Sequence, residues 1–149
     1  MSQGEPMDVL SESECWSLLS GMALGRLATS VEGQPEIFPV NFVVQRRTVL
    51  FRTAEGAKLF TVVMNSAVAF EADEHNMSEG WSVIVKGRAL VLNSYAEIQE
   101  AERAQLLSWT ATSKRRYVRV IPSVITGRRF RFGPEPDCDW PLAPTSCSA

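Results

Sequence analysis

Residues 48–59, T-V-L-F-R-T-A-E-G-A-K-L, place two cations around a turn from a strand into a helix. The β-branched and aromatic run T-V-L-F-R is typical of a strand, and a helical pattern begins near Ala57 after the break at T-A-E-G. Such a turn directs free backbone N–H groups at one spot, and the helix dipole adds partial positive charge there. Arg52 and Lys58 flank the spot, and Thr53 adds a hydroxyl. The stretch therefore predicts a phosphate site.

The alternative is an ordinary turn whose cations only pair with Glu55 or Glu71. Other chemistry is sparse in this sequence. Its single histidine, His75, lies in a polar stretch typical of the surface, and its three cysteines lack metal-ligand spacing. We therefore expect no structural metal and no required disulfide.

Composition and charge exclude several classes of protein. The chain has 149 residues, 45% of them hydrophobic and 21% charged, which suits one globular domain. The formal net charge of -2 argues against nonspecific nucleic-acid binding. No apolar run reaches the roughly 18 residues of a membrane span. The first residues, M-S-Q-G-E-P-M-D, do not resemble a signal peptide, so we expect a cytoplasmic protein.

The pattern predicts short helices among strands that follow one another closely. Ser11 and Glu14 form a capping box that starts the first helix, which ends near Gly21. A proline within a strand removes a donor from the ladder, so Pro39 predicts an edge or a bulge. Gly87 predicts a bulge or a bend in the strand that contains it. The expected strands span residues 25–31, 37–45, 48–52, 67–72, 81–92 and 117–132, the last interrupted at Pro122 and Gly127, and the other helices span 57–64 and 94–108.

Six strands joined by short connections close most readily as an antiparallel barrel, so the predicted fold is mainly β with short helices. No G-x-G-x-x-G motif follows a strand, which leaves a Rossmann fold without support. We expect one domain over residues 9–132, a disordered segment over 1–8, and a proline-rich tail over 133–149.

A basic region lies late in the chain. Strand alternation puts Tyr117 and Arg119 on one face, which we expect to be a solvated face. The region could also attract an anionic substrate or pair with the acidic helix 97–102. Its members are Lys114, Arg115, Arg116, Arg119, Arg128, Arg129 and Arg131.

The order of the motifs resembles the pyridoxamine 5'-phosphate oxidase-like family of flavin-binding split barrels. A capped helix is followed by G-R-L-A-T, P-V-N-F, L-F-R-T-A-E-G-A-K-L, G-W-S-V-I-V-K-G-R-A, a helix, and R-R-Y-V-R-V-I-P-S-V-I-T-G-R-R. The chain is most similar to the small actinobacterial-type branch that includes nitroimidazole-resistance-like proteins. The resemblance covers residues 10–132 and implies a six-stranded antiparallel split β-barrel, a homodimer, and FMN sites between the two chains.

The resemblance also implies which residues border the cofactor. Pro39, Val40 and Asn41 match the strand along the isoalloxazine ring. Lys58 matches the family's phosphate-binding lysine. The remaining matches are Phe51, Arg52 and Thr53 beside the ribityl chain and phosphate, Trp81 and Ser82 from the partner chain, and Trp109 near the cofactor.

The chain departs from the authentic oxidase at two places. Ala57 stands where the oxidase has a further cation, and the substrate-phosphate motif is not evident in R-R-Y-V-R-V-I-P-S. A deazaflavin coenzyme or haem therefore stays open beside FMN. Because a flavin carries its own redox chemistry, an oxidoreductase needs no catalytic triad here. Two functions stay open: an FMN-dependent oxidoreductase acting on a small molecule, and a non-catalytic dimeric module that binds a flavin, a deazaflavin or haem.

Overall fold

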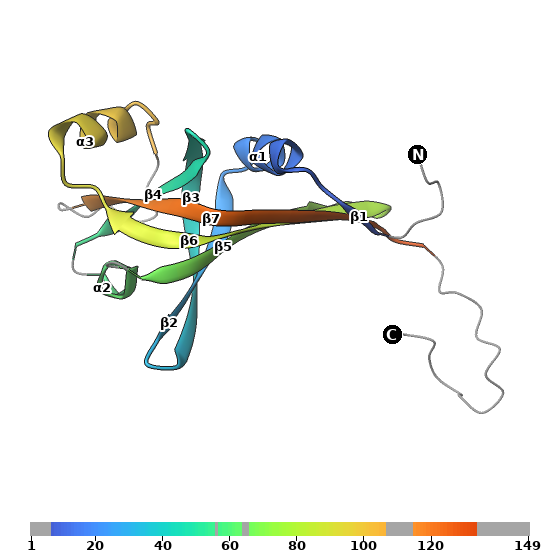
Figure 1. The fold of residues 1–149 in the computed structure, drawn as a ribbon, viewed down its shortest axis with the longest axis horizontal. Coiled ribbons are helices and arrows are strands. Elements are labelled where there is room, and N and C mark those ends of the chain that lie inside the picture. Colours follow the sequence, from blue (N-terminus) through green and yellow to red (C-terminus); the bar gives the residue numbers. More distant parts are fainter. Residues whose placement is uncertain (1–6, 56, 64–65, 107–114, 134–149) are drawn as a thin grey trace.

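The computed structural model describes residues 7–55, 57–63, 66–106 and 115–133 (Figure 1). The predicted Trp109 and the tail beyond 133 lie outside the described residues. The elements are β1 (Met7–Val9), α1 (Glu12–Ser20), β2 (Leu24–Val31), β3 (Gln34–Gln45), β4 (Thr48–Ala54), α2 (Lys58–Val63), β5 (Ala67–His75), β6 (Glu79–Val91), α3 (Tyr95–Glu102) and β7 (Arg115–Arg131).

Six antiparallel strands close into a ring. Hydrogen bonding runs in the order β7-β4-β3-β2-β5-β6, and β6 pairs with β7 again to complete the circuit. The short strand β1 adds to the far end of β7, where Met7 lies opposite Phe130. The predicted antiparallel barrel with short helices is therefore confirmed. In Figure 1, α1 and α3 lie on one side of the long β6–β7 pair and α2 lies on the other.

Strand β3 changes partner along its length. Residues 34–41 pair with β2, whereas residues 42–45 pair with β4. In the described pairings, the edge of residues 34–41 that faces away from β2 carries no strand, which is the split in the barrel. Pro39 lies in this part of β3, opposite Arg26, so the predicted edge position is confirmed.

Serine caps begin both α1 and α3, and the cap at Ser11 is the predicted one. Ser11 accepts a hydrogen bond from the Glu14 backbone N–H at 3.2 Å, and the Ser11 N–H donates to the Glu14 carboxylate at 3.0 Å. Ser94 caps α3 in the same way by accepting from the Glu97 N–H. These bonds satisfy backbone donors that a helix start would leave unpaired, which typically contributes about 1 kcal/mol per cap.

The core consists of two clusters on opposite sides of the sheet. The larger cluster fills the barrel and includes the fully buried rings of Phe51 and Phe70. The smaller cluster lies between α3 and the strands beneath it, and its buried members are Leu50, Leu92, Ala101 and Tyr117. Helix α3 therefore covers one end of the outer surface of the barrel.

Several predicted boundaries shift. Met7 and Asp8 belong to β1 rather than to a disordered segment, and β5 continues through His75 beyond the predicted end at residue 72. Strand β7 is continuous through Pro122 and Gly127. Pro122 is tolerated because it lies opposite Gly87 at the predicted bulge, where the register shifts.

Gly127 lies beneath α1 and the segment before it. A Cβ on this residue would sit 2.6 Å from Cys15 Sγ, so the glycine permits close packing of the helix rather than a break in the strand. Among the described residues there is no helix long and apolar enough to cross a membrane, and no cluster of metal-ligating side chains.

Candidate functional site

The predicted site residues divide between the inside of the barrel and its outer surface. Val40, Phe51 and Trp81 belong to the cluster inside the barrel and are at most 8% exposed. Thr53 is also buried, two residues after Phe51 on the same face of β4. Their side chains are therefore packed inside the barrel and inaccessible to a ligand. A cofactor would have to contact these residues mainly through their backbone atoms.

Lys58 is the predicted residue best placed to meet a charged ligand. It is the first residue of α2, its side chain is 66% exposed, and its Nζ lies 2.6 Å from Glu36 Oε1 on β3. The two glutamates that the sequence suggested as alternative partners are paired with other cations. Glu55 Oε1 lies 3.9 Å from Arg116 Nη2, and Glu71 Oε1 lies 3.0 Å from Arg26 Nη1. An exposed ion pair of this kind contributes only about 0–1 kcal/mol, so an anion can compete with Glu36 for the lysine.

A buried hydroxyl lies on the same face as Glu36. Thr29 on β2 is directly opposite Glu36 in the register, and directly opposite residues share a face. Thr29 is 4% exposed, and its Oγ1 has no hydrogen-bond partner within the described part of the chain. An unpartnered buried hydroxyl is uncommon, because it forfeits its hydrogen bonds to water. Thr29 was missed at the sequence level because a threonine in a strand gives no signal of its own.

Arg52 does not flank the same spot as Lys58, contrary to the prediction. It lies between Phe51 and Thr53 and so points to the other face of β4, beneath α3. Its guanidinium lies 5.0 Å from the centre of the Tyr117 ring, and Nη1 donates to the Leu106 carbonyl at 3.4 Å. Its Nε is buried without a partner among the described groups. Arg52 therefore helps to attach the segment that follows α3.

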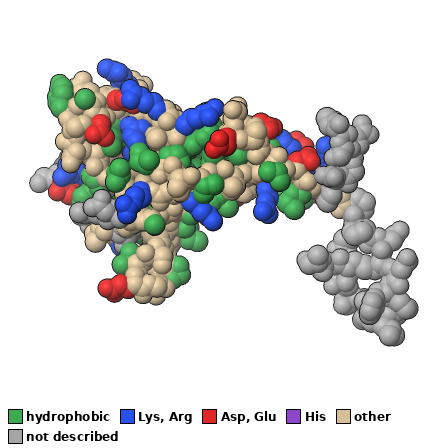
Figure 2. Space-filling model, viewed as in Figure 1, with side chains coloured by type: hydrophobic (Ala, Val, Ile, Leu, Met, Phe, Trp, Pro, Cys, Tyr) green, Lys and Arg blue, Asp and Glu red, His purple; other side chains and the backbone are tan. Residues whose placement is uncertain are grey.

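Arg119 corrects a second prediction. This residue was expected on a solvated face, but it is 8% exposed. Its guanidinium donates to Thr48 Oγ1 at 2.7 Å and to Gln45 Oε1 at 3.1 Å. Elsewhere in the basic region Arg128 and Arg131 are exposed, and Arg115, Arg116 and Arg129 are partly exposed. Figure 2 shows Lys and Arg side chains interspersed with Asp and Glu on the face of the molecule that it presents.

The remaining predicted residues lie on the outer surface of the barrel. Pro39 is opposite Arg26, and Arg26 is opposite Glu71 on β5. One row further along, Asp73 is opposite Ser82 on β6. Pro39 on β3 and Ser82 on β6 therefore lie on the same outer surface. Strands β2 and β5, which carry the charged residues, run between them. Asn41 lies two residues from Pro39 on the same face.

Arg26 links the two acids of this surface. Its Nη1 lies 3.0 Å from Glu71 Oε1 and 3.5 Å from Asp73 Oδ2. Burial, the hydrogen bond with Asp73 and the charge of Asp73 together raise the pKa of Glu71, Arg26 opposes the rise, and the resulting pKa is about 7. The sequence holds a signal for this group, because E-A-D places two acids on one face of a strand.

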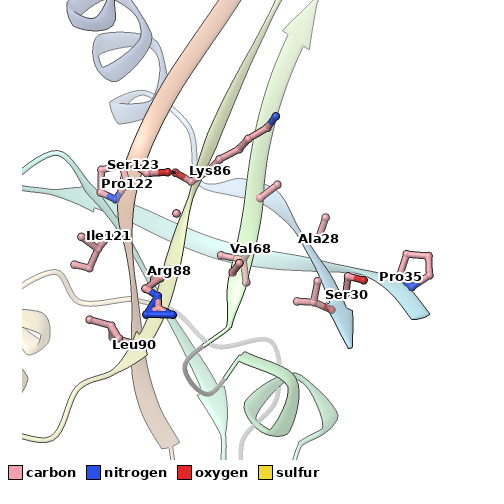
Figure 3. A pocket seen from close by; sticks show the side chains of 14 residues that line it. Ala28, Ser30, Pro35, Val68, Lys86, Arg88, Leu90, Ile121, Pro122 and Ser123 are labelled. Atoms are coloured by element: carbon pink, nitrogen blue, oxygen red, sulfur yellow. Dashed lines mark hydrogen bonds between the residues drawn. The ribbon is translucent and has the colours of Figure 1, made fainter. Parts of the chain in front are cut away.

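An apolar hollow adjoins these charges. It has a volume of about 900 Å³ and lies on the outer surface of β2, β5, β6 and β7 (Figure 3). Small residues that point outward leave the space, among them Ala28, Ser30, Ala67 and Ala69. None of the nine predicted site residues in the described part of the chain lines it. The hollow could not be predicted from the sequence, because alternating small residues become informative only once the register of the strands aligns them.

Comparison with known proteins gives concordant matches. A family described as pyridoxamine 5'-phosphate oxidase matches residues 11–129. The structure of an FAD binding protein from Mycobacterium smegmatis is 58% identical, covers 85% of this chain and 100% of its own, and has a TM-score of 0.80. A conserved protein of unknown function from Corynebacterium diphtheriae is 38% identical, covers 85% of this chain and 99% of its own, and has a TM-score of 0.75. An uncharacterised protein of Mycobacterium tuberculosis is 74% identical over 95 residues, which are 64% of this chain and 86% of the relative.

Proposed function

This chain belongs to the pyridoxamine 5'-phosphate oxidase family, and on that premise we propose that it binds a flavin and uses it to oxidise or reduce a small molecule. The observation that carries the proposal is the 58% identity with the FAD binding protein of M. smegmatis over the whole length of that protein. Identity at this level is spread along the fold, so it supports a shared cofactor better than the fold alone does.

The flavin we propose is FAD. FMN follows from the family resemblance at large, whereas a relative that shares more than half of its residues is an FAD binding protein. Ala57 points in the same direction, because a phosphate cradle with a single lysine is weak for a small cofactor that depends on one terminal phosphate. A dinucleotide adds a second phosphate and an adenosine, and so distributes its binding over more contacts.

The described residues fit a phosphate at Lys58. The lysine supplies an exposed cation, and Glu36 is a competitor that a phosphate must displace. The edge of β3 over residues 34–41 offers backbone groups that no described strand pairs. Pro39 lacks a donor at this edge, so its neighbours would supply the hydrogen bonds.

The division of chemical work follows from this placement. The bound flavin would supply the transfer of hydride or electrons. The chain would hold the phosphate through Lys58, orient the ring along the unpaired edge of β3, and exclude water with the apolar residues of the barrel surface. Glu71 would hold or release a proton near neutral pH on the same surface as Pro39 and Ser82.

We also propose a homodimer. The support is a set of large apolar side chains that the described protomer leaves on its outer surface: Leu24, Ile37, Leu90, Ile121 and Val124. Light scattering of the purified protein tests this, and a monomer at micromolar concentration would contradict it.

FAD and FMN titrations test the proposed function. We expect FAD to quench tryptophan fluorescence saturably and more tightly than FMN, and the bound flavin to be reduced by a nicotinamide coenzyme with a quinone as acceptor. Binding without reduction would assign the chain a carrier or sensing role. No binding of either flavin at tens of micromolar would overturn the proposal.

A further inference from the structure

One face of the sheet carries an apolar patch at the far end of β7. A single row of the register crosses β1, β7, β6 and β5 and consists of Met7, Phe130, Gly80 and His75. Opposite residues share a face of a sheet. The ring of Phe132, two residues after Phe130, has its centre 5.8 Å from the Phe130 ring and 6.1 Å from the His75 ring. We call Met7, His75, Phe130 and Phe132 the arm patch.

The arm patch is open to solvent. Phe132 is 50% exposed and Met7 is 49% exposed. Helix α1 lies on the opposite face, because Trp81, the neighbour of Gly80, points the other way and joins the buried cluster that includes Cys15 of α1. In Figure 1, β1 and the adjoining end of β7 extend away from the barrel. A contiguous exposed aromatic patch, unlike a single exposed apolar residue, is typical of a binding surface.

The sequence beyond Gly133 has the composition that such a surface recognises. Residues 134–149, outside the described part of the chain, read P-E-P-D-C-D-W-P-L-A-P-T-S-C-S-A. Proline has no N–H to donate, so this tail segment is unsuited to extend the sheet as a further strand. Proline-rich segments instead dock through their side chains on aromatic surfaces. In a polyproline helix, with its three residues per turn, Pro141 and Pro144 would share one face, next to Trp140.

Charge and length also suit the tail segment. Its charged residues are Glu135, Asp137 and Asp139, with no lysine or arginine. Arg128 lies two residues before Phe130 on the same face, is exposed, and takes part in no ion pair with a described residue. The seven residues from Gly133 to Trp140 reach about 22 Å in a polyproline helix. Residues 128–132 of β7 span only about 13 Å, so Trp140 can return along the whole patch.

We propose that the tail segment folds back onto the arm patch, with Trp140 and Pro141 against Phe130 and Phe132 and its acidic residues toward Arg128. The attachment itself favours this occupant. A short linker gives an effective concentration in the millimolar range, whereas a second copy of the chain must reach the patch from solution. The proposal does not rest on the flavin, because no arm-patch residue belongs to the proposed flavin site.

Fluorine NMR of the full-length protein labelled with 5-fluorotryptophan tests the proposal. Trp140→Phe identifies the Trp140 signal by its loss, and a labelled peptide of residues 134–149 gives the position of this signal in a free tail. We expect the signal of the full chain to lie away from the peptide position. Phe132→Ser should return it to the peptide position. Val31→Ser removes an exposed apolar side chain from the β2–β3 hairpin and should leave it unchanged.

Two further readouts do not depend on Phe132→Ser. Arg128→Gln should move the Trp140 signal part of the way to the peptide position, as should added salt, which screens the acidic tail from this arginine. Arg103→Gln removes an exposed cation at the end of α3 and should not move it. Trp140→Ser, which alters no described residue, should speed amide hydrogen exchange at Phe132, whose N–H donates to the Ser78 carbonyl at 2.7 Å.

Several results would overturn the proposal. They are a Trp140 signal at the peptide position in the full chain, a signal that does not respond to Phe132→Ser, and exchange at Phe132 that Trp140→Ser leaves unchanged. A displaced signal that returns on dilution, or a dimer that Phe132→Ser converts to monomers, would assign the arm patch to a contact between copies and so overturn it as well. Failure of FAD to bind would remove the proposed function and leave the result on the tail intact.

Discussion

The outer surface of the barrel has a covered end and an open end, and the same residue type behaves differently at each. Under α3, Arg119 and Arg52 are packed against Thr48, Gln45 and Tyr117. At the open end, the side chains of Lys86 and Arg88 lie beside an apolar hollow without an ion pair to any described residue. The difference shows that the structural role of an outward-facing cation depends on whether a helix covers it.

Arg119 should give the largest effect that separates the two ends. We expect Arg119→Ala to lower the free energy of unfolding by about 2–4 kcal/mol, because the change leaves Thr48 and Gln45 without their donor and opens a cavity. Arg88→Ala, at the open end, should change it by less than about 0.5 kcal/mol. Urea unfolding followed by tryptophan fluorescence measures both. Equal effects would mean that coverage by α3 does not matter.

Substitution of Gly87 tests how firmly strands β6 and β7 are held together at the open end. Gly87→Ala should cost about 1–3 kcal/mol, because the new methyl group meets the Ile121 backbone and not a flexible side chain. Gly133→Ala, which meets no atom within 4 Å, is the matched control. Thermal unfolding measures the pair, and a neutral Gly87→Ala would show that the strands separate easily at the bulge.

The exposed ion pair between Lys58 on α2 and Glu36 on β3 is a third setting for a cation, beside the covered end and the open end. Lys58→Ala should weaken FAD binding by about 1–2 kcal/mol, as expected for one charge-assisted contact, with little change in stability. Glu36→Gln should act in the opposite direction by removing the competitor for the lysine. Fluorescence titration measures both affinities. An unchanged affinity in Lys58→Ala would place the phosphate elsewhere.

Glu71 should give the smallest effect, seen only as a dependence on pH. Its pKa is raised from 4.5 to about 7 in the folded chain, so the folded state binds more protons between these values. Stability should therefore fall as pH rises through this window, and Glu71→Gln should flatten the fall. Urea midpoints at pH 5 and pH 7.5 measure it, with the exposed Glu102→Gln as control. An unaltered slope in Glu71→Gln would show that Glu71 is not the group responsible.

Local signals predicted much of the fold. The capping box at Ser11, the proline at position 39 and the glycine at position 87 each act through the backbone of their own strand or helix, so their consequences are visible in sequence. The prediction that Pro122 and Gly127 interrupt the last strand is wrong for a physical reason. Each is tolerated in a continuous strand by something distant, the bulge at Gly87 and the packing of Cys15.

The candidate site was less predictable because it depends on register and coverage. Lys58 was found from its turn, but its partner Glu36 lies on another strand. Arg52 and Lys58 are six positions apart in sequence, yet the alternation of β4 and the place of α3 give them different neighbours. Arg26, Thr29 and the hollow emerge only when four strands are aligned.

The mass and absorbance spectrum of the cofactor that co-purifies with the full chain decide whether this protein binds FAD. We expect the mass of FAD and a flavin spectrum, or uptake of FAD by colourless protein to one flavin per protomer. A haem spectrum, a deazaflavin mass, or colourless protein that takes up no flavin would contradict it.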